Sequence, residues 1–256
     1  MALQNNSGSG LTGGILPLAH KELLGNRPVT NVAFMPLSTG AEPLLLVSYG
    51  PVGAQLGSEA LLKEHSLAGM GLLCVWDLSS PQAPKSVLVS EGTPNCCGFV
   101  PAPASHIVFA GMEEGGVYLW DLEESAARHP TEQIGGQALV VRRPSYTTDY
   151  LADMITSGAP IVSAVAVPRG GSRATPCYLY TLSAWGNASV WTLTITGRNE
   201  GSDMDLGMRV GSCIRLVRLA ANVKLGLAAL KTKDGKTEAK GLDAVSNSRR
   251  RPTRNA

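Results

Sequence analysis

The sequence predicts an all-β protein that is assembled from repeated four-stranded sheets. Short apolar runs alternate along the chain with turns that contain Gly or Pro, which is typical of β-strands. The same order of runs recurs three times, and each copy ends at a tryptophan. With 256 residues, 44% of them hydrophobic and 16% charged, the chain can bury a sizeable core and is expected to be globular.

Each of the three copies contains an apolar run closed by proline, a second apolar run, and a run that carries the tryptophan. The runs are, in that order, Pro28–Pro36, Pro43–Tyr49 and Gly71–Leu78; Pro94–Pro101, His106–Gly111 and Val117–Leu122; Pro160–Pro168, Cys177–Leu182 and Ser189–Leu193. Proline has no backbone N–H, so it belongs at a strand boundary. We expect fourth strands at Lys85–Ser90, Gln137–Val141 and Ile214–Leu219, which gives blades at about 28–90, 94–141 and 160–219.

The spacing of the tryptophans indicates the kind of repeat. Trp76 and Trp120 lie 44 residues apart, which fits the period of about 40 to 45 residues in WD repeats. Trp191 follows 71 residues after Trp120, so an insertion is expected at about 128–158. The sequence thus predicts a partial WD-repeat β-propeller of about three blades over residues 28–226. Its structural blade markers are Trp76, Asp77, Trp120, Asp121 and Trp191, and we expect the three tryptophans to pack between blades and to contact no ligand.

The turns mark this propeller as divergent. Many WD repeats carry an Asp in the turn before the third strand and a His upstream, and these form a buried hydrogen-bonded tetrad with Ser and Trp. Here the second turn is Glu113-Glu-Gly-Gly116 and the third is Trp185-Gly-Asn187. We therefore expect the tetrad to be absent or degenerate.

The charges are distributed unevenly around a net charge of +2. Residues 1–208 contain ten Lys and Arg against seventeen Asp and Glu, whereas residues 209–256 contain twelve against three. We expect a flexible N-terminal segment over 1–27 and a basic, disordered C-terminal tail over 227–256. The tail has no aromatic residue for stacking on bases, so no nucleic-acid partner is expected. The alternative is a functional tail that attracts nucleic acid, an anionic membrane or the acidic surface of a microtubule.

Catalytic and metal-binding motifs are not found in the sequence. The four histidines are scattered, the five cysteines form no C-x-x-C pair, and no phosphate-binding glycine motif is present. No apolar run approaches the roughly 18 residues that a membrane-spanning helix needs, and the first thirty residues do not resemble a secretory signal. We therefore predict a protein that is not an enzyme, with no catalytic residue, no cofactor, no metal site and no membrane insertion.

Several segments resemble the WD-repeat intermediate chains of dynein motors. In that family a Val-Trp-(Asp/Asn) strand is followed by a Pro-rich turn and an apolar strand that ends in an acidic residue, as in Gly71–Glu91 here. The match continues through Thr93–Pro101, with its paired cysteines, to Gly116–Leu122, and again in Ser202–Val217. The resemblance covers roughly residues 28–226. It is strongest to the larger intermediate chains of the cytoplasmic type two dynein, which drives retrograde intraflagellar transport.

The resemblance implies a non-catalytic scaffold subunit of a ciliary dynein complex, located in the cilium or flagellum and in the cytoplasm on the cytoskeleton. The implied partners are the dynein heavy chain, the second intermediate chain and the light chains, although residues 1–27 are too short for the family's light-chain region. The alternatives are an intermediate chain of axonemal or general cytoplasmic dynein, or a generic WD-repeat interaction scaffold.

Two further expectations concern surfaces. Acidic residues near one rim of the propeller could face a basic partner. These residues are Glu113, Glu114, Glu123 and Glu124, together with Asp121. A propeller ring closes with four to eight blades, so three blades should leave apolar flanks open.

Overall fold

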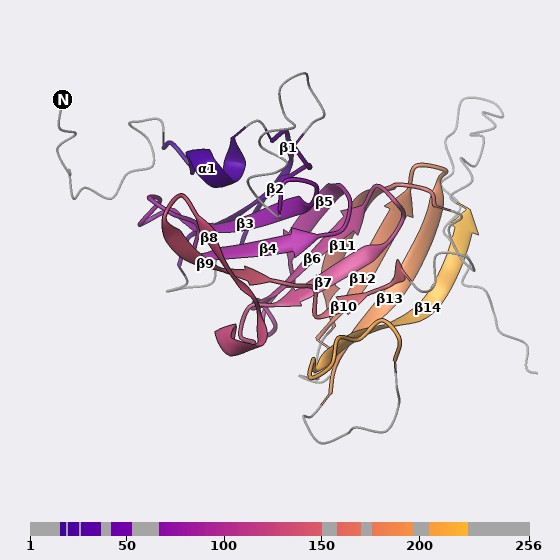
Figure 1. Ribbon diagram of the computed structural model, residues 1–256. Coiled ribbons are helices and arrows are strands. Elements are labelled where there is room, and N and C mark those ends of the chain that lie inside the picture. Colours follow the sequence, from indigo (N-terminus) through magenta and orange to yellow (C-terminus); the bar gives the residue numbers. More distant parts are fainter. Residues whose placement is uncertain are drawn as a thin grey trace, which may run out of the picture. The chain divides into compact units, whose positions relative to one another are not determined.

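The computed structural model describes residues 16–18, 20–25, 27–36, 42–52, 67–149, 158–169, 176–196 and 205–224 (Figure 1). The chain divides into two units, 1–225 and 226–256, and every described residue belongs to the first. The predicted C-terminal tail and most of the predicted N-terminal segment therefore lie outside the described residues. The helical elements of the described residues are α1 (Lys21–Leu24) and the 3-10 turn η1 (Ala126–Arg128).

The strands form three sheets. The first has the order β1 (Val29–Phe34), β2 (Leu44–Tyr49), β3 (Gly71–Asp77), β4 (Ser86–Ser90), β9 (Gln137–Arg142), β8 (Thr131–Ile134). The second has the order β10 (Tyr146–Thr147), β7 (Val117–Asp121), β6 (Ile107–Met112), β5 (Pro94–Phe99). The third has the order β11 (Ile161–Pro168), β12 (Cys177–Ser183), β13 (Asn187–Ile195), β14 (Ile214–Lys224).

The prediction of an all-β partial propeller is confirmed. Strands of one sheet that follow each other directly in the chain pair antiparallel. Short Gly-containing turns join β6 to β7 and β12 to β13. The turn between β6 and β7 has Gly115 at φ 94°, and the turn between β12 and β13 has Gly186 at φ 77°. Positive φ is a conformation that glycine adopts without strain, which explains glycine at both turns.

The predicted fourth strand of the second sheet is wrong. Gln137–Val141 lies within β9, which pairs in parallel with β4 of the first sheet through Val87↔Val141 and Leu88↔Arg142. The short β10 takes the edge position in the second sheet, where Tyr146 pairs with Leu119. Gly135 and Gly136, both at positive φ, close the β8–β9 hairpin and turn it back onto the first sheet. The described part of the expected insertion, residues 128–149 and 158, thus contains β8, β9 and β10.

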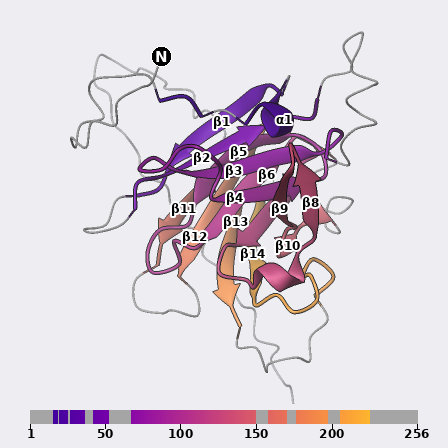
Figure 2. The same cartoon turned by 60° about the vertical axis from the view of Figure 1, so that its left-hand side comes forward.

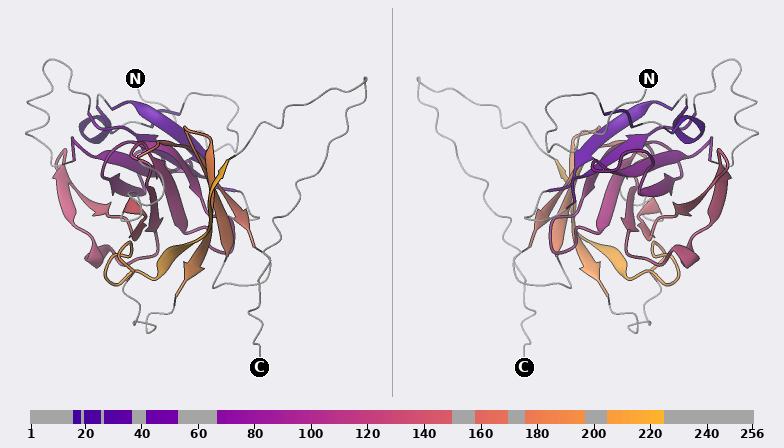
Figure 3. Two further views of the ribbon diagram at one scale, coloured as in Figure 1. Left: turned by 90° about the vertical axis from the view of Figure 1, so that its right-hand side faces the viewer. Right: turned by 90° about the vertical axis from the view of Figure 1, so that its left-hand side faces the viewer.

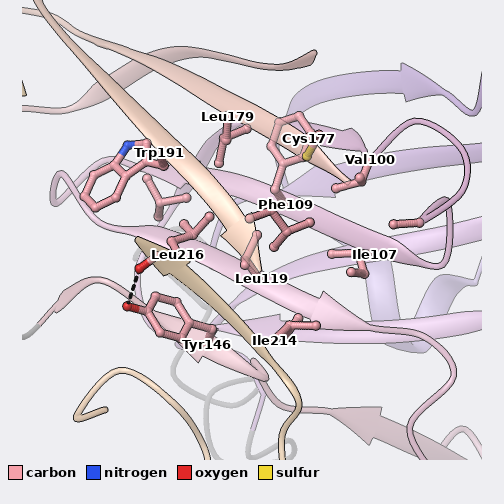
Figure 4. Packing of buried hydrophobic residues seen from close by; sticks show 13 residues of the cluster. Val100, Ile107, Phe109, Leu119, Tyr146, Cys177, Leu179, Trp191, Ile214 and Leu216 are labelled. Atoms are coloured by element: carbon pink, nitrogen blue, oxygen red, sulfur yellow. Dashed lines mark hydrogen bonds between the residues drawn. The ribbon is translucent and has the colours of Figure 1, made fainter. Parts of the chain in front are cut away.

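The sheets stack through two buried layers. Between the first and second sheets, Leu46, Leu73 and Leu88 pack against residues such as Phe99 and Trp120. Between the second and third sheets, Phe109, Leu119 and Tyr146 pack against Trp191 and Leu216 (Figure 4). The Tyr146 hydroxyl donates a 3.1 Å hydrogen bond to the Leu216 carbonyl, so the short β10 is also tied to β14.

A third apolar layer covers the outer face of the first sheet. Trp76 and Val47 of this face pack with Leu23 of α1, with Leu67 and with Ile134 of β8. Figure 2 shows α1 and the β8–β9 hairpin beside the first sheet. Arg27 holds the cover in place, because its guanidinium donates to the backbone carbonyls of four residues. These are Leu23 (3.1 Å), Gly50 (3.1 Å), Leu67 (2.5 Å) and Met70 (2.6 Å). Burial lowers the pKa of Arg27 to about 10, so it stays charged at neutral pH.

The tetrad expected of many WD repeats is reduced to one hydrogen bond in the third sheet. Trp191 pairs across the strands with Leu179, and its indole N–H donates to the hydroxyl of Thr181 at 3.1 Å. The register places Val47 and Ala110 at the equivalent positions beside Trp76 and Trp120. Neither side chain can accept a hydrogen bond, and within the described residues the Trp120 indole N–H is buried without a partner.

Replacing Thr181 by Val should lower the free energy of unfolding by about 1 to 3 kcal/mol, because a buried indole N–H loses its acceptor while the side-chain volume is kept. Thr194→Val is the matched control, since Thr194 lies on the opposite face of the third sheet and is half-buried. The control should change stability by less than about 0.5 kcal/mol. Urea unfolding followed by tryptophan fluorescence measures both variants, and equal losses would contradict this role for Thr181.

Candidate functional site: protein-interaction surfaces

The five blade markers lie in the sheet cores and in the turns that follow the third strands. Trp76 and Trp120 are fully buried, and Trp191 is 3% exposed. The two aspartates begin the turns that follow the third strands. Asp77 Oδ1 accepts a hydrogen bond from the backbone N–H of Ser79 at 2.8 Å, and Asp121 Oδ1 accepts one from Glu123 at 2.9 Å. These are the local turns that aspartate favours.

The β6–β7 turn presents an acidic surface. Glu113 and Glu114 are exposed there, and a cleft of about 440 Å³ beside it is lined by Glu91, Tyr118 and Asp149 among others. Burial raises the pKa of Tyr118 above its ordinary value, and the neighbouring Asp149 carboxylate raises it further. Burial likewise raises the pKa of Asp149. Carboxylates thus gather at this end of β7, and Arg143 and Arg209 also line the cleft.

The expectation that all the acidic residues share one rim is wrong. Glu113 and Glu114 precede β7, whereas Asp121, Glu123 and Glu124 lie at its other end. A strand of five residues separates the two groups by about 13 Å or more, which exceeds the screening length of about 8 Å at physiological salt. Two local surfaces, not one rim, therefore carry these charges.

Glu124 is also buried, contrary to its predicted place on a partner-facing loop. Its side chain is 5% exposed, and Oε2 forms an ion pair with Arg209 and lies 3.2 Å from His129 Nε2. Arg142 Nη1 donates to the Glu124 carbonyl at 2.9 Å, and Arg209 Nε donates to the Pro144 carbonyl at 3.1 Å. A buried carboxylate needs such partners to offset its desolvation. At this end of β7, Asp121 is half-buried and Glu124 is buried, so Glu123 is the exposed acidic residue of the three.

This network ties the segment after β7 to the segment before β14. Burial raises the pKa of Glu124, and Arg209 partly opposes the rise. Burial, then the positive charges of Arg209 and Arg142, lower the pKa of His129 to about 4. Next to the network lies a cleft of about 690 Å³ whose lining includes His106, Arg128 and Thr196. Like the cleft beside the β6–β7 turn, it is lined by residues of both charges.

Stability should fall as the pH decreases from about 6.5 to about 4 because of His129. The unfolded chain binds a proton at His129 with a pKa near 6.5, whereas the folded chain resists protonation until about pH 4. Acid therefore favours unfolding in this window, by at most about 2 kcal/mol once the opposite effect of Glu124 is included. His129→Gln should flatten the pH dependence of the melting temperature.

His106→Gln controls for the loss of a histidine, because the His106 side chain lies outside the network and is 25% exposed. Calorimetric melts from pH 4 to 7 give the slope of stability against pH for each protein. A His129→Gln slope as steep as that of the unmodified chain would rule out the assignment.

The described residues show little that could perform chemistry. Burial raises the pKa of the Cys74, Cys97 and Cys177 thiols to about 12, so they remain protonated at neutral pH and are poor nucleophiles. No group of three or more metal-ligating side chains gathers in the described part of the chain. Within the same residues, no helix has the length and hydropathy of a membrane-spanning helix. The described part of the chain is built of buried sheet layers with charged surfaces.

Comparison with known proteins finds similarity to dynein intermediate chains. The chain is 29% identical over 170 residues to the cytoplasmic dynein 2 intermediate chain 1 of Mus musculus, which covers 59% of this chain and 17% of the relative. It is 25% identical over 173 residues to the protein of the same name from Homo sapiens, covering 60% of this chain and 16% of the relative. No family model matches the sequence. The resemblance to dynein intermediate chains is thus confirmed, and the chain spans less than a fifth of the curated relatives it matches.

Proposed function

We propose that this chain is part of a non-catalytic scaffold subunit of a dynein 2 motor complex, acts as a dynein intermediate chain, and binds the dynein heavy chain. In this role it supports retrograde intraflagellar transport and cilium assembly, in the cilium or flagellum and in the cytoplasm on the cytoskeleton. The observation that carries the proposal is the similarity to cytoplasmic dynein 2 intermediate chain 1 over about 60% of the chain.

The architecture supports a scaffold role. The sheets stack through apolar interiors, which makes their surfaces rigid. A rigid surface loses little conformational entropy when it binds a partner. The protonated thiols and the dispersed histidines favour binding over catalysis. The second intermediate chain and the light chains are further proposed partners.

The acidic turn between β6 and β7 is the proposed contact for a basic segment of the heavy chain. Glu113 and Glu114 are both exposed, and Glu91 and Asp149 add negative charge behind them. At the other end of β7, Arg128, Arg142 and Arg209 offset the acidic groups. Because electrostatic attraction acts mainly on encounter, the turn should increase the association rate.

Reversing the charge of the turn tests this contact. Glu113→Lys/Glu114→Lys should slow association with a purified heavy-chain tail by about tenfold, and the difference should shrink at high salt. Glu123→Lys at the opposite end of β7 is the control and should change the rate by less than about twofold. Surface plasmon resonance at low and high salt measures both. Equal effects of the two variants would remove the turn from the interface.

Affinity purification from flagellated cells tests the complex itself. Recovery with intraflagellar-transport trains supports the dynein 2 assignment, whereas recovery with salt-extracted axonemal arms supports an axonemal intermediate chain. Recovery with general cytoplasmic dynein, or with no dynein subunit, points to the remaining alternatives. Mass spectrometry of the purified material distinguishes these outcomes.

A further inference from the structure

Trp185 is exposed at the tip of the β12–β13 turn. It is 61% exposed, whereas the other three tryptophans of the chain are no more than 3% exposed. Two hydrogen bonds to Ser183 fix the turn. Its carbonyl accepts from the Gly186 N–H at 2.9 Å, and its Oγ accepts from the Asn187 N–H at 3.2 Å. A tryptophan that a fixed turn holds in water is typical of a residue that anchors a partner.

The β12–β13 turn lies outside the faces through which the sheets stack. The layers between sheets consist of strand residues such as Leu119, Trp120 and Leu193. Figure 3 shows the third sheet, in orange, beside the second. A further sheet stacked in the same way would cover strand faces and leave the tips of the hairpins in water. The exposure of Trp185 therefore does not depend on the number of sheets in the stack.

The β12–β13 turn is next to the acidic β6–β7 turn. A Cβ at Gly111, two residues before Glu113, would lie 2.4 Å from a side-chain carbon of Ile161. Ile161 pairs with Ser183, two residues before Trp185. The two turns thus lie at the same end of adjacent sheets, and stacked sheets are about 10 Å apart. An extended chain rises about 3.3 Å per residue, so about three residues bridge the turns.

The charges near the two turns favour a cationic partner. Glu113 and Glu114 are both exposed on the β6–β7 turn, and strands β11 to β14 contain no Asp or Glu. In the described part of the chain, the register places one basic residue beside the β12–β13 turn, Lys224 opposite Asn187. The two exposed carboxylates therefore make the space between the turns attractive to cations.

The third sheet pairs other aromatic rings with arginine. Arg169 Cζ lies 5.3 Å from the ring centroid of Tyr178, and Arg218 Cζ lies 6.0 Å from that of Trp191. Among the described residues, no cation lies over the ring of Trp185. An indole is the best aromatic partner for a cation, and a planar, weakly hydrated guanidinium stacks on it better than an ammonium does. Trp185 thus presents a surface for an arginine side chain.

We propose that the two turns together bind an extended segment of a partner that carries two Arg residues about three positions apart. One guanidinium stacks on Trp185, and the other pairs with the carboxylates of Glu113 and Glu114. This inference rests on the contact proposed above for the β6–β7 turn. It adds to that contact an aromatic anchor and a preference for Arg over Lys.

Three twelve-residue peptides test the inference on the full chain. Each consists of Ser and Gly around two central residues three positions apart, which are Arg, Lys or Leu. Fluorescence anisotropy of labelled peptides at low salt should show the Arg peptide binding at least about fivefold more tightly than the Lys peptide, and about tenfold more tightly than the Leu peptide. The unlabelled Arg peptide should also protect tryptophan emission from acrylamide, because Trp185 is the tryptophan that the quencher reaches.

Trp185→Ala should weaken binding of the Arg peptide by about tenfold and remove the preference for Arg over Lys, whereas Trp185→Phe should keep part of it. Glu113→Gln/Glu114→Gln should weaken the Arg and Lys peptides alike and leave the preference in place. Phe34→Ala is the matched control, since Phe34 is an aromatic residue of the first sheet and is 70% exposed; it should change binding by less than about twofold. Equal affinity for the Arg and Leu peptides, or an unchanged preference in Trp185→Ala, would overturn the inference.

The purified heavy-chain tail separates this inference from the proposed function. Tail binding that depends on Glu113 and Glu114 but is unchanged in Trp185→Ala contradicts the inference and leaves the proposed contact intact. Binding of the Arg peptide that Trp185→Ala weakens, without any binding of the tail, supports the inference and removes the heavy chain as the partner.

Discussion

The second sheet is apolar on both faces, and the rest of the structure depends on that constraint. Every residue of β6 is buried, so the strand lacks the apolar–polar alternation of a sheet with one side in water. Such a sheet is stable only between two others. Gly111 allows the third sheet to approach closely, since a Cβ there would lie 2.4 Å from a side-chain carbon of Ile161. The first and third sheets are thus fixed relative to the second by close packing.

Much of this layering follows from the sequence, because strand and turn signals are local. Proline at strand ends, glycine at turns and tryptophan on the third strands predict β1 to β7 and β11 to β14 within a few residues. The strand with which β9 pairs could not be predicted from such local signals. Its apolar residues fit the edge of the first sheet as well as that of the second, and the choice depends on the β8–β9 turn and on the burial of Ile134 and Val141.

The acidic surfaces show a similar limit. Sequence proximity suggests that Glu123 and Glu124 behave alike, yet one is exposed and the other is paired with Arg209, which is 85 residues away in the chain. Long-range ion pairs of this kind leave no local signal. The charge of the third sheet, by contrast, is visible in the sequence as long stretches without Asp or Glu. Only the fold shows that the same strands carry exposed apolar side chains such as Val165 and Tyr180.

The two ends of the stack therefore have different physical roles. At the first sheet, α1, Arg27 and the β8–β9 hairpin cover the apolar outer face over β3 and β4, whereas Val32 and Phe34 of β1 remain exposed on that face. At the third sheet, β-branched and tyrosine side chains remain in water, which lowers stability unless something covers them. Under the proposed function, the acidic β6–β7 turn attracts a basic segment of a partner.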